Sequence, residues 1–339
     1  MRICTLVSSY ESSAEPTHGL DPYSDPSRWL PDHECELHLI EKATAIPAVR
    51  ALAQRGFDVF INLCDGAAGD DCAGVEVVRE LERLGVAFTG VGSECYELPR
   101  EATKRACRDA GIDAPASLLV SSPDDAERAA ALLSFPLIVK HPNSYSSIGL
   151  ERASRVEDLA ALRGQIARMC SAFGGALVEE FISGREFTVL VAEPRAGETA
   201  PIVYPPVEFV FPPGETFKHF QLKWIDYSKM STRPVADPAL EERIADVAQK
   251  VFVGMSMSSY IRIDLRLDAG GHLHVLDVNS YPAMFYAPDS FGSADLILAA
   301  TPGGHRAFLD HLIDCARRRQ QRLQRDWDAQ RGLPFSHDL

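Results

Sequence analysis

Short apolar runs and amphipathic segments alternate through the first hundred residues. Their periods predict the order β-α-β-α-β, which is typical of a small parallel α/β layer. The predicted strands cover residues 2–7, 59–63 and 87–89, and the predicted helices cover 45–55 and 74–84, the second ending at Gly85. Residues 11–36 are rich in Pro, Ser, Asp and His and show neither period. We expect them to form a long loop at the C-terminal edge of the sheet, where α/β proteins bind ligands, or a disordered surface insertion.

The rest of the chain alternates strands and helices less regularly. Helices are predicted at four places, namely 100–110, from Ser122-Pro123 onward, after a capping-box pattern at 154–157, and 238–252. Residues 201–234 contain six prolines and many aromatic residues, which favours a lid over a cleft. The alternative for residues 204–211 is an aromatic strand that packs on the core. The chain from Ala316 is rich in Arg and Gln and predicts a solvated helix.

Polar and apolar residues also alternate over 261–268, the period of a half-buried strand. Gly270-Gly271 can supply the two positive-φ positions of a tight hairpin turn into a second strand. Two cross-strand pairs follow from such a turn: Asp264 with Asp277, and Arg262 with Asn279. Two carboxylates and an amide beside an arginine suit Mg²⁺ that is also bound by phosphate oxygens, so the hairpin indicates a nucleotide triphosphate site. Exposed polar positions on an edge hairpin are the alternative.

Two upstream segments strengthen the nucleotide interpretation. A strand over 135–140 ends in Lys140, and the loop 143–149 that follows is rich in small hydroxyl residues. Such a loop can cradle phosphate with its N–H groups and hydroxyls beside the point charge of the lysine. Another apolar strand runs into Glu179 and Glu180, followed by a Ser-Gly turn and a further strand. An ordinary surface turn and a solvated strand end are the alternatives for these two segments.

Three stretches of the chain together resemble the ATP-grasp superfamily, specifically its D-alanine–D-alanine ligase branch. They are FPLIVKHPNSYSSIGL, ALVEEFISGREFTV and IRIDLRLDAGGHLHVLDVNSYPAM. The resemblance covers residues 100–300 well and the first hundred loosely. It implies an α/β, ATP-grasp fold in which a small parallel N-terminal layer joins two α+β subdomains that clamp ATP. The implied divisions are an N-terminal substrate-side domain at 1–100, a central ATP-grasp subdomain at 101–190, a C-terminal ATP-grasp subdomain with the magnesium hairpin at 191–320, and a helical tail at 321–339.

The resemblance also implies roles for single residues. The expected ATP contacts are Lys104 and Lys140 on the phosphates, Glu179, Glu180 and Ile182 along the adenine edge, and Glu186 on the ribose hydroxyls. The expected catalytic residues are Arg262 on the oxyanion, with a backbone N–H near Ala283, Lys223 in the mobile loop, and Ser146 and Ser147 in the phosphate-covering loop. The expected metal ligands are Asp264, Asp277 and Asn279. The implied cofactors are ATP and two Mg²⁺ ions, and Mn²⁺ can replace the Mg²⁺.

Both substrate ends depart from the family pattern. The first strand opens into Ser8-Ser9-Tyr10-Glu11-Ser12-Ser13 where the family has a glycine-rich loop, so Glu11 is the nearest candidate for holding an amino group. The segment 63–71 differs from the family's His-Gly motif, Trp224 stands where a tyrosine is common, and Pro288-Asp289 replaces an expected serine. We therefore expect substrates other than D-alanine.

Composition narrows the class of protein. The net charge of −14 over 339 residues argues against nucleic acid or an anionic membrane as a partner. No apolar run reaches transmembrane length, and the start does not read as a signal peptide. Eight cysteines without a CxxC pair predict reduced thiols and a cytoplasmic protein. Cys64 has no adjacent base for a nucleophilic role, and His272 and His274 lack a third zinc ligand, so inert positions are favoured for all three.

The resemblance implies an ADP-forming acid–amino-acid ligase that joins a carboxylate to an amine through an acyl phosphate. The specific expectation is an amino-acid or dipeptide ligase of specialised metabolism, acting on small-molecule carboxylates and amines and forming a homodimer. Two alternatives stay open. One is a D-alanine–D-alanine ligase of cell-wall synthesis, and the other is a non-catalytic nucleotide-binding module, which would not need the oxyanion arginine.

Overall fold

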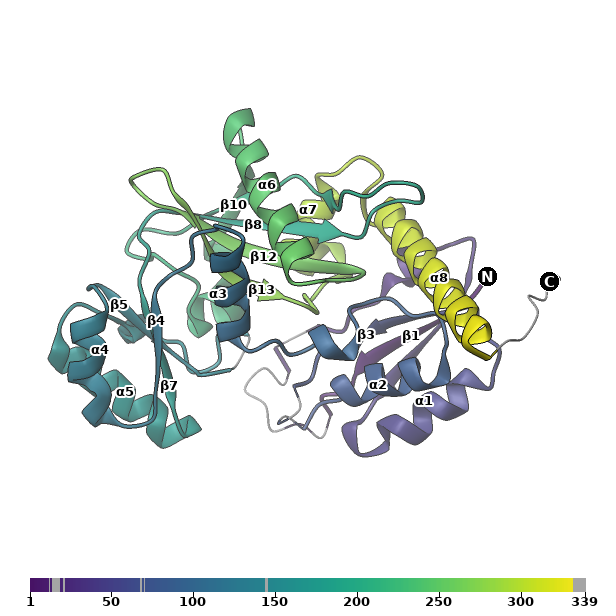
Figure 1. The fold of residues 1–339 in the computed structure, drawn as a ribbon, viewed down its shortest axis with the longest axis horizontal. Coiled ribbons are helices and arrows are strands. Elements are labelled where there is room, and N and C mark those ends of the chain that lie inside the picture. Colours follow the sequence, from purple (N-terminus) through teal and green to yellow (C-terminus); the bar gives the residue numbers. More distant parts are fainter. Residues whose placement is uncertain are drawn as a thin grey trace.

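Three β-sheets organise the chain in the computed structural model (Figure 1). The structure describes residues 1–331 apart from 12, 14–18, 21, 68, 70, 144 and 145. Parts of the expected loop 11–36, of segment 63–71 and of the Ser-rich loop therefore lie outside the described residues, as does the tail from 332 onward.

The N-terminal sheet is parallel, with the order β2-β1-β3. Its strands and helices are β1 (Arg2–Ser8), β2 (Glu34–Ile40), β3 (Val59–Leu63), α1 (Ala45–Ala53) and α2 (Val75–Leu84). Gly85 ends α2 in the left-handed conformation, as its position predicts. Two expectations were wrong. Residues 11–36 are not all loop, because Pro26–Trp29 form a 3₁₀ turn and β2 begins at Glu34; and residues 87–89 form only an isolated bridge, between Phe88 and Phe60.

The second sheet is antiparallel, with the order β4-β7-β5-β6. Its elements are β4 (Ser117–Val120), β5 (Leu137–Lys140), β6 (Arg155–Val156), β7 (Ala176–Glu180), α4 (Ala126–Leu132) and α5 (Leu159–Phe173), and α3 (Arg100–Asp109) precedes it. Ser122 caps a 3₁₀ turn that leads into α4. The capping box expected at 154–157 was wrong, because Arg155–Val156 pair with β5 as a strand and Asp158 caps α5 through its bond to the Ala161 N–H.

The third and largest sheet has the order β11-β10-β8-β12-β13, with β9 beside β8. Its elements are β8 (Arg185–Ala192), β9 (Ile202–Val203), β10 (Val207–Val210), β11 (Ser231–Pro234), β12 (Tyr260–Leu267), β13 (Leu273–Asn279) and the helix α6 (Pro238–Gly254). The odd-numbered residues of β8 and β12, such as Val189 and Ile263, pack in one apolar cluster with α6 residues such as Ile244. Side chains alternate along a strand, so the even-numbered residues face away from α6, and this opposite face carries the candidate site.

The β12–β13 hairpin pairs the expected residues through an unexpected turn. Asp264 lies opposite Asp277, and Arg262 lies opposite Asn279. The two-glycine turn was wrong: the loop has three residues between Asp268 and His272, and only Gly271 has a positive φ, of 83°. A β-bulge next to Leu265 leaves Leu276 unopposed and shifts the register back by one residue. The bulge thus restores the pairing that the shorter turn predicted.

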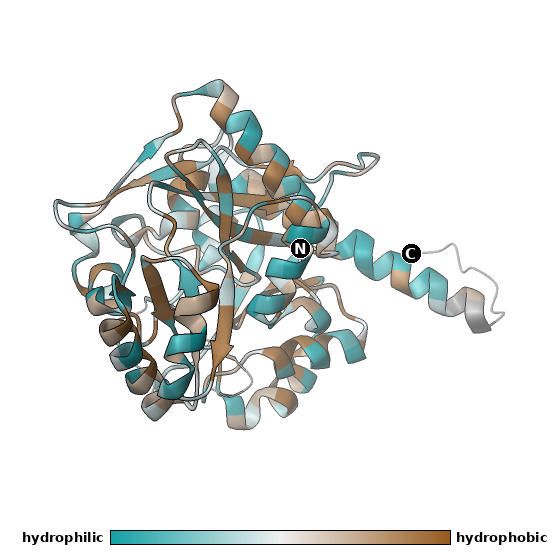
Figure 2. Ribbon diagram, turned by 60° about the vertical axis from the view of Figure 1, so that its left-hand side comes forward, coloured by the Kyte–Doolittle hydropathy of each residue, from teal (hydrophilic) through white to brown (hydrophobic). Residues whose placement is uncertain are grey.

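Helix α8 (Gly304–Arg331) begins earlier than the sequence predicts. Its first half is buried, since Phe308, Leu312 and Ala316 join strands of two sheets in one core cluster. Its second half extends from the body as a largely hydrophilic helix (Figure 2), and this part agrees with the predicted solvated helix. In the described part of the chain, no helix is long and apolar enough to cross a membrane.

Candidate active site

Lys104 and Lys140, the lysine pair, share one buried carboxylate. Lys104 comes from α3, Lys140 ends β5, and Glu179 lies on the neighbouring strand β7. The Nζ atom of Lys104 is 2.8 Å from Glu179 Oε1, and Lys140 binds the other oxygen. Burial would raise the pKa of Glu179, but Lys140, Lys104 and Arg100 outweigh it and lower the pKa to about 2. The carboxylate therefore stays ionised and holds two cations together, which leaves a net positive charge for a phosphate.

Glu180 and Ile182 continue the strand that carries Glu179. Neighbouring side chains of a strand point to opposite faces. The Glu180 carboxylate accordingly accepts a bond from the Ser134 N–H at 2.8 Å, away from the lysine pair. The Ile182 carbonyl accepts a bond from Arg266 Nη1 at 2.6 Å. Arg266 thus fixes the chain path at the expected adenine edge.

The described part of the Ser-rich loop is pinned to a segment far along the sequence. Ser146 and Ser147 both have a φ of 59°, a conformation that residues other than glycine rarely adopt. The indole Nε1 of Trp224 donates to the Ser146 carbonyl at 2.9 Å, and the Ser147 hydroxyl donates to the Lys218 carbonyl at 3.0 Å. The expected neighbours Ser144 and Tyr145 lie outside the described residues.

Residues 211–230, here called the lid segment, lie against this loop. The Phe220 N–H donates to the Leu150 carbonyl at 2.9 Å, and a π-helical turn follows at Gln221–Ile225. Lys223 is in this turn, with its ammonium 5.0 Å from the centre of the Trp224 ring. Trp224, a departure from the family pattern, thus packs with Lys223 and closes the lid segment onto the loop.

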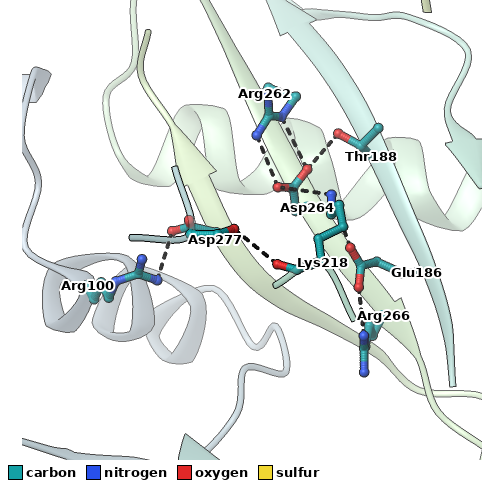
Figure 3. Close-up of polar contacts among 9 residues, drawn as sticks. Arg100, Glu186, Thr188, Lys218, Arg262, Asp264, Arg266 and Asp277 are labelled. Carbon is teal, nitrogen blue, oxygen red and sulfur yellow. Dashed lines mark hydrogen bonds and ion pairs between the residues drawn. The ribbon is translucent and has the colours of Figure 1, made fainter. Parts of the chain in front are cut away.

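Thr188, Asp264 and Asp277 form one row across β8, β12 and β13, here called the metal row (Figure 3). Arg262 Nε and Nη2 each lie 3.2 Å from an oxygen of Asp264, and the Thr188 hydroxyl donates to Asp264 at 2.6 Å. Burial opposes ionisation of Asp264, but Arg262, Lys218 and Thr188 keep its pKa well below the usual range. Asp277 pairs with Arg100 at 3.4 Å.

The metal row fits a divalent cation that also has phosphate ligands. The two carboxylates are hard oxygen ligands, and Asn279, two residues beyond Asp277 on β13, adds an amide. The Asn279 Nδ2 atom is buried without a hydrogen-bond partner among the described residues. Nowhere in the described ranges do three or more His, Cys, Asp or Glu side chains form a preassembled metal site. A divalent cation held by these residues would take its remaining ligands from phosphate or water oxygens.

Glu186 and three cationic side chains lie beside the residues described above. The expected ribose acceptor, Glu186, is buried and binds Arg266 at 2.7 Å and Lys218 at 3.1 Å. Sequence reasoning missed Arg266, Lys218 and Arg100. Arg266 is two residues from Asp264, so strand alternation alone places it on the site's face. Arg100 comes from α3 and Lys218 from the lid segment, and no local sequence pattern identifies either of them.

A small cavity lies beside the expected oxyanion position. It is lined by segments from both ends of the chain, including Tyr10, Tyr23, Asp65, Tyr281 and Ala283. Asp65 accepts bonds from the hydroxyls of Tyr10 at 2.8 Å and Ser8 at 3.2 Å. Glu11, the expected amino-group ligand, is exposed and does not line it.

Three other candidate positions have structural explanations. Cys64 is buried, and burial raises its pKa well above the usual value, which disfavours the thiolate of a nucleophile. His272 lies 3.6 Å from Asp113, and His274 lies 2.9 Å from Asp268.

Comparisons with known proteins point to one family of ligases. Residues 109–287 match the family model described as D-ala D-ala ligase C-terminus. D-alanine–D-alanine ligase B of Chromobacterium violaceum is 26% identical over 282 residues, which cover 82% of this chain and 81% of that protein. D-alanine–D-alanine ligase of Stutzerimonas stutzeri is 31% identical over 208 residues, 60% of this chain and 62% of that protein.

Solved structures share the fold. The D-alanine–D-alanine ligase of Coxiella burnetii superposes with a TM-score of 0.70 at 15% identity, covering 98% of this chain and 99% of that one. The Bacillus anthracis enzyme complexed with ATP gives 0.68 at 18% identity, covering 95% and 99%. The predicted ATP-grasp fold is therefore confirmed.

The fold and these relatives identify an ATP-grasp ligase, an ATP-dependent and ADP-forming enzyme. The family model spans more than half of the sequence. The chain belongs to the D-ala D-ala ligase C-terminus family. The expectation of a ligase is thus confirmed, and the non-catalytic nucleotide-binding module is not supported.

Proposed function

We propose that this ligase joins the carboxyl group of one amino acid to the amino group of another, with D-alanine in both positions. The observation that carries the proposal is the way Arg100 and Lys218 connect the site in a chain of this family. Arg100 acts on Glu179 of the lysine pair and pairs with Asp277 at 3.4 Å, and Lys218 of the lid segment lies 3.9 Å from Asp264. The named relatives are all D-alanine–D-alanine ligases. They favour this reaction over the specialised-metabolism ligase that the sequence suggested.

The reaction has two steps with a balanced exchange of groups. A carboxylate oxygen of the first amino acid attacks the γ-phosphorus of ATP, and the bond to ADP breaks, giving an acyl phosphate. The amine of the second amino acid then attacks the acyl carbon; a C–N bond forms, phosphate leaves, and the amine loses a proton to solvent. Such transfers depend mainly on positioning and charge neutralisation.

Each group of candidate residues has a place in this chemistry. Lys104 and Lys140 would hold the phosphates, and Glu186 the ribose hydroxyls. Arg262 and the backbone N–H near Ala283 would stabilise the tetrahedral oxyanion. The lid segment would keep water from the acyl phosphate. Asp264, Asp277 and Asn279 would hold Mg²⁺, which neutralises charge on the transferring phosphoryl group when bound.

A different amino acid in one position is the second candidate. The cavity beside Ala283 favours it, because tyrosines and Asp65 line a space where the family pattern already differs. A carboxylate next to aromatic rings suits an ammonium group. Asp289, by contrast, is exposed on the 3₁₀ turn Pro288–Ser290 and does not line this cavity.

A product screen tests the proposal. The protein is incubated with ATP, Mg²⁺ and D-alanine alone, then with D-alanine paired with other D- and L-amino acids, and ADP and dipeptide masses are measured. We expect ADP and D-alanyl-D-alanine in equal amounts from D-alanine alone. Faster formation of a mixed dipeptide would favour the second candidate. ADP formation that no amino acid stimulates would contradict both.

A further inference from the structure

Lys218 lies where the nucleotide contacts, the metal row and the lid segment meet (Figure 3). Its Nζ atom is 3.1 Å from Glu186 Oε1 and 3.9 Å from Asp264 Oδ2. Its backbone carbonyl accepts the bond from the Ser147 hydroxyl of the phosphate loop. One residue therefore contacts the expected ribose acceptor, an expected metal ligand and the phosphate loop.

The ammonium of Lys218 is held in this position by packing. It lies 3.7 Å from the centre of the Phe209 ring, which is a cation–π contact. Phe209 is on β10, opposite Glu186 of β8. The neighbouring residues Phe217 and His219 are both buried, which anchors the backbone on either side. The lysine is thus a fixed charge above the sheet and not a mobile surface group.

A fixed ammonium beside Asp264 opposes a divalent cation there. Asp264 already binds the Arg262 guanidinium and has the Lys218 ammonium 3.9 Å away, so a metal must share its oxygens with two cationic side chains. Like charges a few ångströms apart repel strongly in a partly buried site. Among the described residues, Asp264, Asp277 and Asn279 are the expected ligands, so phosphate oxygens would complete the metal's coordination.

Phosphate reverses the sign of this interaction. An anionic oxygen between the ammonium and the metal attracts both, so the lysine that repels a lone metal ion supports a metal–phosphate pair. We propose that Lys218 makes the divalent metal and the nucleotide bind as a pair, weakening metal binding at Asp264 without nucleotide and strengthening nucleotide binding when both are present. The inference rests on the proposed nucleotide and metal site, and it is a thermodynamic coupling between two ligands.

Binding measurements without any amino acid test this coupling. Mn²⁺ affinity is measured by electron paramagnetic resonance with and without the non-hydrolysable ATP analogue AMP-PNP, and analogue affinity is measured by calorimetry. In Lys218→Met, which keeps the length of the side chain and removes its charge, we expect nucleotide-free Mn²⁺ to bind about tenfold more tightly or better, and AMP-PNP with Mn²⁺ to bind about tenfold more weakly. A merely structural lysine would not move the two affinities in opposite directions.

Two further variants control the result. Lys218→Arg keeps the charge and should preserve the wild-type dependence of Mn²⁺ on nucleotide. Lys250→Met removes an exposed lysine paired with Asp246 on α6 and should leave both affinities unchanged. Unchanged or weaker nucleotide-free Mn²⁺ binding in Lys218→Met would overturn the inference. A negative result of that kind would leave the ligase proposal intact, because the product screen measures turnover independently.

Discussion

Replacing Asp277 with asparagine is expected to abolish metal-dependent turnover. Asp277 is partly exposed and forms an ion pair with Arg100 at 3.4 Å, a contact of the kind that adds little to stability. The substitution keeps the size of the side chain but removes a charged oxygen opposite Asp264. A catalytic metal contributes several kcal/mol to the transition state, so we expect ADP formation to fall by roughly three orders of magnitude.

The measurement combines ADP release with Mn²⁺ affinity in the presence of AMP-PNP. Asp246→Asn, on the exposed face of α6, is the matched control and should retain both. If Asp277→Asn keeps near wild-type turnover, the assignment of the metal row is wrong.

Arg262→Met is expected to slow amide formation by a factor of about 10²–10³ without weakening the binding of nucleotide or metal. An oxyanion donor is worth about this much in rate. Arg262 binds Asp264 through two nitrogens, but Thr188 and Lys218 remain beside that carboxylate when the guanidinium is removed. Removing a cation that competes for Asp264 should not weaken metal binding, and an arginine that contacts the oxyanion rather than the nucleotide should leave AMP-PNP affinity unchanged. Both affinities should therefore stay at or above the wild-type values.

Arg233→Met is the control variant, because it also removes an arginine from the third sheet. It removes one partner of the buried Glu208, which keeps its bonds to Arg185. This variant should turn over normally. A loss of nucleotide affinity in Arg262→Met equal to its loss of rate would instead make Arg262 a phosphate contact.

Strand periodicity predicted the central part of the candidate site, and the error in the hairpin turn did not change that prediction. Alternation over 261–268 puts Arg262, Asp264 and Arg266 on one face whichever loop closes the hairpin. The cross-strand pairs survived a wrong turn because the bulge opposite Leu265 compensates for the longer loop. No sequence rule for two-residue turns contains that bulge, since it depends on how β13 packs.

Long-range packing explains what the sequence could not predict. Lys218 reaches Asp264 because Phe217 and His219 are buried and the lid segment folds over the sheet. Arg100 meets Asp277 because α3 packs near the end of β13. Strand β2 was missed because it is an edge strand, whose mixture of charged and half-exposed apolar residues lacks a buried face. Each of these depends on contacts between segments that are far apart in sequence.

Transfer of ¹⁸O from the substrate carboxylate to phosphate is the most direct measurement of the proposed reaction. The amino acid that acts as the carboxylate donor in the product screen is labelled in both carboxylate oxygens, and the phosphate formed is analysed by mass spectrometry. An acyl-phosphate route predicts one ¹⁸O atom in each phosphate released with ADP, because the attacking oxygen leaves with the phosphoryl group. Unlabelled phosphate, or label found in AMP, would contradict it.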